Sequence, residues 1–446
     1  MLRRCCVMIL LMGFLATAPI LAAPSENKQP TQDNDYELYK LLVDSIDQVE
    51  QNYVLEIDRR ELIEAAIHGV MEKLDPYSSY IGPDDIEQLR TTVESEFGGI
   101  GIQVTLEEGE LKIISPIYGT PAYKAGLLAG DKIVEIDGKS TDNLTLDEAT
   151  HRLKGKEGTS LTLTVIHSGS ENKEQITVTR KRIHVETVLG DRRKPDGKWD
   201  FMLDPNLYIG YVRLTAFSRD TSGELQRALE QLQSAGMRGL ILDLRFNPGG
   251  LLNAAIEVSD LFISEGRIVS TKGRSTPERS WDAHKPGTFE GFPIVVLVNR
   301  FSASASEIVS ACLQDHQRAV IMGERTWGKG SVQSVIELED GKSALKLTTA
   351  AYFRPSGKNI HRFPDAKDQD EWGVLPDKGF LLKLNDKELV DLIQDRRQRD
   401  ILRAGNGDKT TAEKSNQSAK KDKTFIDRQL QMAVKLLTDE LDKKKK

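Results

Sequence analysis

A serine at the start of a predicted helix is the first candidate for chemistry in this chain. Ser304 lies in the segment NRFSASASEI (residues 299–308), which follows an apolar predicted strand and opens a predicted helix. A hydroxyl at such a turn is accessible, and free backbone N–H groups at a helix start can stabilise an oxyanion. The alternative is structural, because Ser304 and Glu307 have capping-box spacing and Ser304 would then only cap the helix.

A serine nucleophile needs a general base, and Lys329 is the candidate. It lies 25 residues after Ser304, a separation that a β-α-β return closes. Lys329 and Gln333 fall on one face of the predicted strand that follows, so Gln333 can orient the amine by hydrogen bonding. Lysine acts as a base only when its pKa falls well below about 10.4, and burial beside apolar groups such as Trp327 would lower it. The alternative is an exposed lysine in a glycine-flanked turn.

Several other chemistries are disfavoured by the sequence. The seven histidines are scattered, and neither a HExxH pair nor a spaced Cys/His cluster occurs, so we expect no metal site. Residues 323–329 fit the start of a phosphate-binding loop, but Gly330 stands where a Ser or Thr should ligate magnesium. A net charge of −7 argues against a protein dominated by contacts with nucleic acid. The sequence therefore predicts no metal, no cofactor and no nucleic-acid partner.

The elements that must position Ser304 and Lys329 belong to a long, ordinary globular chain. Its 446 residues are enough for two to four domains, and 39% hydrophobic with 29% charged residues excludes a multi-span membrane protein or a wholly disordered chain. Helical periodicity comes first, at 36–49 and 60–73, and short β segments begin at residue 97. From residue 207, apolar strands alternate with helices, which indicates βαβ units and a parallel sheet.

The first 23 residues have the layout of a secretory signal peptide, with Arg3 and Arg4 before an apolar run and small residues. The alternative is an uncleaved membrane anchor. Cleavage would leave 59 basic against 68 acidic residues, a net charge of −9, and one of three cysteines. That cysteine, Cys312, lies in an apolar helical stretch, so we expect a buried small hydrophobe and no intramolecular disulfide.

Five separated motifs carry a resemblance to a known family. They are DPYSSY (75–80), FGGIGI (97–102), DLRFNPGG (243–250), SASE (304–307) and GERTWGKGSVQ (323–333). In this order they closely resemble the C-terminal processing (tail-specific) peptidases, which are PDZ-containing Ser/Lys serine peptidases. The resemblance covers roughly residues 36–385.

The resemblance implies a role for each residue that matches a motif. Ser304 would be the nucleophile, Lys329 the general base and Gln333 the residue that orients the lysine. Ser302 and Ser306 are rivals, but the register of the SASE motif and the spacing to the lysine favour Ser304. An acyl-enzyme would form and be hydrolysed without a metal. The oxyanion hole would use the backbone N–H of Ala305 and one from the Gly249-Gly250 turn.

The resemblance also implies a PDZ domain that captures the C-terminal carboxylate of a substrate. The backbone donors would come from Gly99, Ile100, Gly101 and Ile102. The strand that begins at Ile102 would take up the tail by β-addition. Residues 146, 149 and 153 (Leu146, Ala149 and Leu153) would line a side-chain pocket, with ordinary helix core as the alternative.

These inferences predict a multidomain α/β protein with an N-terminal helical unit, an inserted PDZ domain, an α/β (crotonase-like) serine protease core and a C-terminal helical tail. The expected boundaries are a signal peptide (1–23), a helical region (24–96), a PDZ domain (97–183), a core completed by N-terminal segments (184–403), a polar linker (404–424) and a last amphipathic helix with a lysine tail (425–446).

The predicted function is a serine endopeptidase that processes or degrades proteins bound by their C-termini. We expect it in the bacterial periplasm, soluble or membrane-associated, as a homo-oligomer, with an activating adaptor protein as a further partner. The alternative, from another class, is a tail-binding PDZ chaperone or scaffold with a vestigial protease core.

Overall fold

The structure is a computed structural model that describes residues 32–83, 85–86, 94–194, 196–401 and 425–443. The predicted signal peptide and the polar linker lie outside the described residues. The chain divides into two compact units, one ending at Val70 and one beginning at Met71.

The first unit consists of α1 (Gln32–Asn52) and most of α2 (Arg59–Glu72), which confirms both predicted helices. Arg59 joins them within the unit, because its guanidinium pairs with Asp47 at 2.8 Å and with Glu50. The apolar side chains of α1 remain in solvent, with Leu38 at 58% and Leu41 at 63% exposure. An apolar helical face of this kind is typical of an association surface.

The segment predicted to be a PDZ domain lies in the second unit and is built mainly of β strands. Its main sheet has the strand order β3-β4-β5-β7-β8, with β6 pairing β5, and β2 pairs β9 separately. Two helices pack with these strands over an apolar core, which includes Ile133, Leu161 and Leu163. The elements are β2 (Glu96–Gly99), β3 (Ile102–Glu107), β4 (Glu110–Pro116), α4 (Pro121–Lys124), β5 (Lys132–Ile136), β6 (Lys139–Ser140), α5 (Leu146–Leu153), β7 (Ser160–Ile166), β8 (Lys173–Thr179) and β9 (Lys181–His184).

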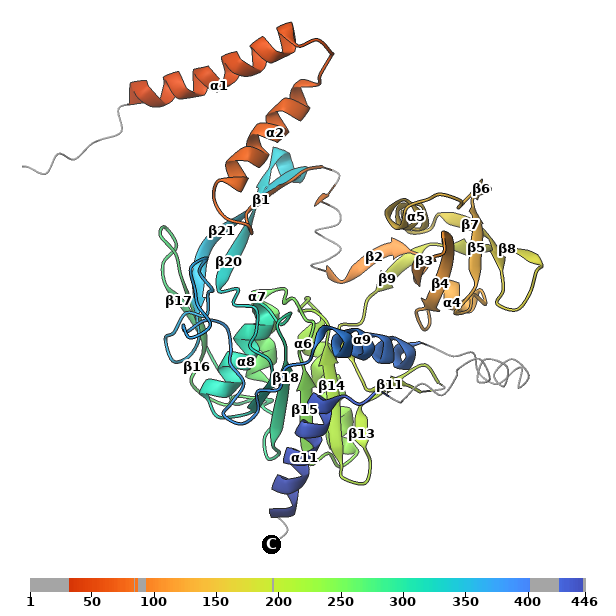
Figure 1. Cartoon of the computed structure of the whole chain (residues 1–446), viewed down its shortest axis with the longest axis vertical. Coiled ribbons are helices and arrows are strands. Elements are labelled where there is room, and N and C mark those ends of the chain that lie inside the picture. Colours follow the sequence, from red (N-terminus) through yellow and green to blue (C-terminus); the bar gives the residue numbers. More distant parts are fainter. Residues whose placement is uncertain (1–31, 84, 87–93, 195, 402–424, 444–446) are drawn as a thin grey trace, which may run out of the picture. The chain divides into compact units, whose positions relative to one another are not determined.

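A second sheet forms the α/β core and confirms the predicted parallel strands. Its order is β10-β14-β15-β18-β19, and the last three pairings are parallel. Apolar residues of α6, α7 and α8 cover one face, and those of α11 cover the other (Figure 1). The elements are β10 (Val188–Leu189), β13 (Met202–Asp204), β14 (Ile209–Leu214), α6 (Thr221–Ser234), β15 (Gly239–Asp243), α7 (Leu252–Asp260), β18 (Ile294–Val298), α8 (Ala305–Asp315), β19 (Val320–Gly323) and α11 (Arg428–Lys443).

An antiparallel sheet completes the core, in the order β1-β21-β16-β17 with β20 pairing β21. It brings residues 79–81 of the N-terminal segment against residues 344–346. The remaining elements are β1 (Ser79–Ile81), the pair β11 (Arg192–Arg193) and β12 (Trp199–Asp200), β16 (Arg267–Lys272), β17 (Arg279–Asp282), β20 (Ser331–Leu338), the short helix η1 (Glu339–Gly341), β21 (Ser343–Phe353) and α9 (Asp386–Asp400).

Cys312 is fully buried on α8, as predicted, and burial raises the pKa of its thiol to about 12, so it stays a neutral apolar group.

Among the helices that the structure describes, none has the length and apolarity needed to cross a membrane.

Candidate active site

Three loops that carry candidate residues leave the same edge of the parallel sheet. Gly249 and Gly250 follow β15, Ser304 follows β18, and Lys329 follows β19. Because β15, β18 and β19 are parallel neighbours, their carboxyl ends lie side by side. Ligands and reacting groups in α/β folds gather at this edge.

Ser304 has an unusual backbone conformation at the junction between β18 and α8. Its φ is 55° and its ψ is −114°, a region that residues other than glycine rarely occupy. Such conformations persist where the surrounding structure enforces them, and they concentrate at functional sites. Ser304 is therefore held in a strained turn between a strand and a helix, as an exposed nucleophile would be. The chain has this turn although its sequence has no G-x-S-x-G motif.

The two rival serines are buried and already used in structural hydrogen bonds. Ser302 Oγ donates to the carbonyl of Leu244 at 2.8 Å, and Ser306 Oγ donates to that of Asn247 at 2.9 Å. Both residues are fully buried, whereas Ser304 is only half-buried. Of the three serines, Ser304 is the one that a substrate can reach.

A single buried carboxylate connects the Ser304 turn to the Lys329 loop. Glu307 Oε2 accepts the backbone N–H of Ser304 at 2.9 Å and that of Lys329 at 2.8 Å. Its other oxygen accepts Gly328 N–H at 2.7 Å and the Thr326 hydroxyl at 2.5 Å. Burial raises the pKa of Glu307, while these hydrogen bonds favour its charged form. Sequence reasoning placed Glu307 only as a capping partner of Ser304 and missed the bridge to Lys329.

Tyr352, on β21, makes a second connection between the same two segments. Its hydroxyl lies 3.1 Å from the carbonyl oxygen of Ser304 and also hydrogen-bonds the carbonyl oxygen of Lys329. Burial raises the pKa of Tyr352, so the phenol stays protonated and can donate. No sequence motif pointed to Tyr352.

The amine of Lys329 is half-buried and lies over an aromatic ring. Its Nζ is 4.9 Å from the centre of the Tyr77 ring. Burial lowers the pKa of Lys329, the charge of Lys346 lowers it further, and Glu307 and Asp75 oppose this shift. Trp327, the apolar neighbour that we expected, is instead 50% exposed.

The DPYSSY motif forms a hydrogen-bonded turn that holds Tyr77 near Lys329. Asp75 Oδ1 accepts the N–H groups of Tyr77 at 2.8 Å and Ser78 at 2.9 Å. Thr348 of β21 donates its hydroxyl to Asp75 at 3.2 Å, and its N–H to Ser78 Oγ at 3.1 Å. Burial opposes the charge of Asp75, but the hydrogen bonds outweigh it and lower the pKa. The motif was visible in the sequence, yet its position beside the lysine was not.

Gln333 lies on β20, close in sequence to Lys329, but its amide donates hydrogen bonds to other residues. Its Nε2 donates to Ser331 Oγ at 2.9 Å and to Thr348 Oγ1 at 3.3 Å. A β-bulge between Val332 and Gln333 shifts the register there. Within the part of the chain that the structure describes, Gln333 makes no hydrogen bond to Lys329 Nζ, and its orienting role stays a prediction.

The candidate oxyanion donors meet around the Gly249-Gly250 turn. A Cβ added at Gly249 would lie 2.8 Å from Ser304 Cβ and 2.9 Å from Ala305 N, so only glycine fits there. The N–H of Gly249 is occupied, because it donates to Asn247 Oδ1 at 2.8 Å. The N–H groups of Gly250 and Ala305 have no acceptor among the described residues.

The predicted tail-binding residues lie together in the β2–β3 segment and on α5. The carbonyls of Ile100 and Gly101 accept Ala122 N–H and Ile117 N–H, both at 2.9 Å, while no acceptor is recorded in the described chain for their own N–H groups. Helix α5 packs along β3 and carries the three predicted pocket residues. Ala149 and Leu153 are buried in the apolar core of this domain, and Leu146 is 40% exposed.

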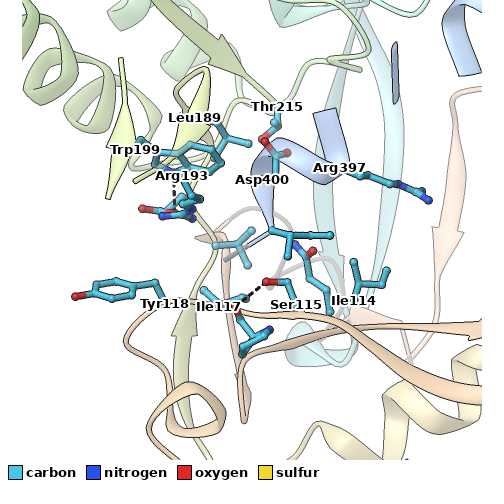
Figure 2. Close-up of a pocket in the computed structure, with 15 residues that line it drawn as sticks. Ile114, Ser115, Ile117, Tyr118, Leu189, Arg193, Trp199, Thr215, Arg397 and Asp400 are labelled. Atoms are coloured by element: carbon cyan, nitrogen blue, oxygen red, sulfur yellow. Dashed lines mark hydrogen bonds and ion pairs between the residues drawn. The ribbon is translucent and has the colours of Figure 1, made fainter. Parts of the chain in front are cut away.

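A separate cavity of about 370 Å³ is lined by none of the candidate catalytic or tail-binding residues. Leu189, Arg193 and Trp199 line part of it, as Figure 2 shows. The Arg193 guanidinium stacks 3.9 Å from the centre of the Trp199 ring and pairs with Glu186. Because neither Ser304, Lys329 nor Gln333 lines it, the cavity is not part of the Ser304 site.

Comparison with known proteins identifies the families that this chain resembles. The model of Peptidase family S41 matches residues 208–377, that of the PDZ domain residues 98–179, and that of the Activating protease CtpB N-terminal domain residues 16–84. The Carboxy-terminal-processing protease of Bartonella bacilliformis is 40% identical over 397 residues, 87% of each chain. The Carboxyl-terminal-processing protease of Synechocystis is 38% identical over 325 residues, 72% of this chain and 71% of the relative.

Among solved structures, the photosystem II D1 C-terminal processing protease is 28% identical with a TM-score of 0.43, and the match covers 82% of this chain and 98% of that one. The matched families define a serine-type peptidase that carries a PDZ domain. The chain belongs to the carboxy-terminal-processing protease family, which confirms the resemblance found in its motifs.

Proposed function

We propose that this peptidase cleaves its substrates with a Ser304/Lys329 pair. The observation that supports it most is that one oxygen of Glu307 accepts the N–H groups of both residues. A second support is the lowered pKa of Lys329, which raises the neutral fraction of its amine at a given pH.

The reaction has two stages. The neutral amine of Lys329 takes the proton from Ser304 Oγ as the oxygen attacks the scissile carbonyl carbon. The resulting oxyanion accepts the N–H groups of Ala305 and Gly250, which have no other acceptor in the described chain. Lys329 then gives its proton to the leaving amine, and an acyl-enzyme ester remains. Water activated by Lys329 hydrolyses this ester and restores Ser304.

Gln333 completes the proposed catalytic set by orienting the amine of Lys329. It stands on β20, whose first residue is two positions after the lysine. Gly249 lets the Ser304 turn approach closely but supplies no oxyanion donor, since its N–H is already bonded to Asn247. This assignment narrows the predicted oxyanion hole to Gly250 and Ala305.

We propose that the PDZ domain binds substrates by their C-terminal tails. The free N–H groups of Ile100 and Gly101 would hold the carboxylate, with those of Gly99 and Ile102 beside them. Because β3 is the terminal strand of its sheet, a substrate strand can add along it by backbone hydrogen bonds. The exposed Leu146 and the adjoining Ala149 and Leu153 would contact the last side chain of the tail.

Assembly and location remain part of the proposal. The exposed apolar face of α1 supports self-association or docking of an activating adaptor, and the match to an activating-protease N-terminal domain covers this region. The leader-like residues 1–23 support export to the bacterial periplasm.

Cleavage of an unfolded protein by purified variants tests the proposed pair. Ser304→Ala and Lys329→Ala should each remain folded by circular dichroism and lose cleavage, whereas Lys378→Ala, at an exposed lysine, should stay active. Full activity in either site variant would exclude the assignment. Tight binding of C-terminal peptides without any proteolysis by the unaltered protein would favour the chaperone alternative.

A further inference from the structure

The PDZ domain contains a buried arginine that has no acidic partner. Arg180, between β8 and β9, is 8% exposed. Its guanidinium donates to the carbonyl of Leu153 at 3.1 Å, that of Arg152 at 2.9 Å, that of Ser160 at 3.3 Å and the Thr159 hydroxyl at 3.1 Å. No carboxylate of the described residues forms an ion pair with it. The positive charge is therefore compensated by dipoles alone.

Two of these dipoles belong to the end of α5. Arg152 and Leu153 are the last two residues of this helix, where carbonyl groups lack partners and the helix carries a partial negative charge. Capping alone does not require a buried cation at this place. Water or uncharged polar groups can satisfy the last carbonyl groups of a helix as well.

The capped helix end lies against the segment that precedes β3. A Cβ added at Gly99 would lie 4.0 Å from the carbonyl oxygen of Leu153, and Gly155 N–H donates to the Gly98 carbonyl at 3.1 Å. A Cβ at Gly155 would lie 2.9 Å from Arg180 Nε. The helix end, Gly155 and the guanidinium are thus packed directly behind the loop that is proposed to receive the substrate carboxylate.

The sign of the charge at this position decides what the loop can bind. An uncompensated helix end would repel a carboxylate placed beside Gly99. Arg180 neutralises that end and adds a positive charge, which is weakly screened because it is buried. We propose that Arg180 is a specificity-determining residue that makes the PDZ domain select a polypeptide end with a free α-carboxylate over an amidated end or an internal segment.

This inference rests on the proposed tail recognition, so its test separates the two. The protein is the full chain with Ser304→Ala, which prevents turnover of the probe. The probes are two fluorescent peptides of one sequence, one with a free C-terminal carboxylate and one with a C-terminal amide, and anisotropy gives both affinities. The parent should bind the carboxylate peptide about tenfold more tightly, a difference of about 1.4 kcal/mol.

Three further substitutions, each made in the Ser304→Ala protein, test the effect of the Arg180 charge. Arg180→Gln should bring the carboxylate-to-amide ratio close to one while amide binding stays unchanged, and Arg180→Lys should keep most of the ratio. Arg182→Gln, which removes an exposed charge two residues further on, is the matched control and should keep the full ratio.

An equal loss for both peptides in Arg180→Gln would show a structural role and overturn the proposal, as would an unchanged ratio. If Arg180→Gln does not fold, Arg180→Lys decides: loss of the ratio with intact amide binding would contradict a charge effect. A parent that does not distinguish the peptides would refute the proposed tail recognition itself.

Discussion

Two buried carboxylates near the same edge of the sheet are stabilised in opposite ways. Glu307 is held by three N–H groups and one hydroxyl, and no cationic side chain of the described residues forms an ion pair with it. Asp243 is held by two guanidinium groups, with Arg245 Nη2 at 2.7 Å and Arg396 also paired, and by the Tyr211 hydroxyl at 2.7 Å. Both carboxylates are fully buried.

The difference appears in how the two groups titrate. Burial raises the pKa of Glu307, and its hydrogen bonds only partly offset that effect. Burial opposes the charge of Asp243 too, but Arg245 and Arg396 outweigh it and hold its pKa well below the usual range. Hydrogen bonds to Glu307 thus connect the Ser304 turn and the Lys329 loop, whereas the ion pairs around Asp243 form a neutral structural cluster.

The ion-pair cluster around Asp243 extends to the C-terminal part of the chain. Arg245 Nη2 pairs with Asp427 at 2.7 Å, and its Nη1 donates to Gln429 at 2.9 Å. Gln429, on α11, donates in turn to the carbonyl of Leu382 at 2.7 Å. The segment that follows the predicted linker therefore completes a network directly after β15.

The largest effect on activity should come from the dipole-stabilised carboxylate. Glu307→Ala removes the shared acceptor of Ser304 and Lys329, and misplacing reacting groups by about 1 Å can cost about 100-fold in rate. We expect kcat to fall by about that factor. Glu337→Ala, at an exposed position on β20, should leave kcat unchanged. A wild-type kcat in Glu307→Ala would show that Glu307 does not position Ser304 and Lys329 for the reaction.

The ion-paired carboxylate should affect stability instead. Asp427→Ala leaves Arg245 buried and partly unpaired, and breaking a buried pair costs about 3 kcal/mol. Urea unfolding should show that loss, while kcat per folded molecule changes little. Asp439→Ala, exposed on α11, is the matched control. If Asp427→Ala lowered kcat and spared stability, the contrast between the two clusters would be wrong.

A smaller effect on rate is expected at Gln333. Loss of one orienting hydrogen bond is worth about 1 kcal/mol, so Gln333→Ala should lower kcat/KM by about fivefold. Ser334→Ala, its neighbour on β20, should have less effect. A loss in Gln333→Ala as large as in Lys329→Ala would indicate that the amide does more than orient the amine.

The pH dependence follows from the direction of the Lys329 shift. Only the neutral amine accepts the Ser304 proton, so activity should rise with pH and level off above the pKa of Lys329. Because burial lowers this pKa, the midpoint should lie below about 10.4, the value of an ordinary lysine. Lys346→Met removes a like charge and should move the midpoint upward by a few tenths of a unit. A downward shift would contradict the electrostatic account.

The sequence predicts much of the scaffold and little of the support around the site. Apolar strands such as 239–244 and 293–298 indicate a parallel sheet, and parallel neighbours bring the ends of distant loops together. Periodicity does not reveal which side chains meet afterwards. Tyr77 lies near Lys329 from far upstream, and Arg245 meets Asp427 across 182 residues. Such contacts depend on tertiary packing, for which a single sequence has no local signal.

The direct test of the central claim is labelling of the protein with a serine-reactive fluorophosphonate, followed by peptide mapping. We expect one modified residue, Ser304, and a labelling rate that falls at least 100-fold in Lys329→Met. The rate should also rise with pH in parallel with cleavage. Modification at Ser302 or Ser306, or undiminished labelling of Ser304 in Lys329→Met, would contradict the Ser304/Lys329 assignment.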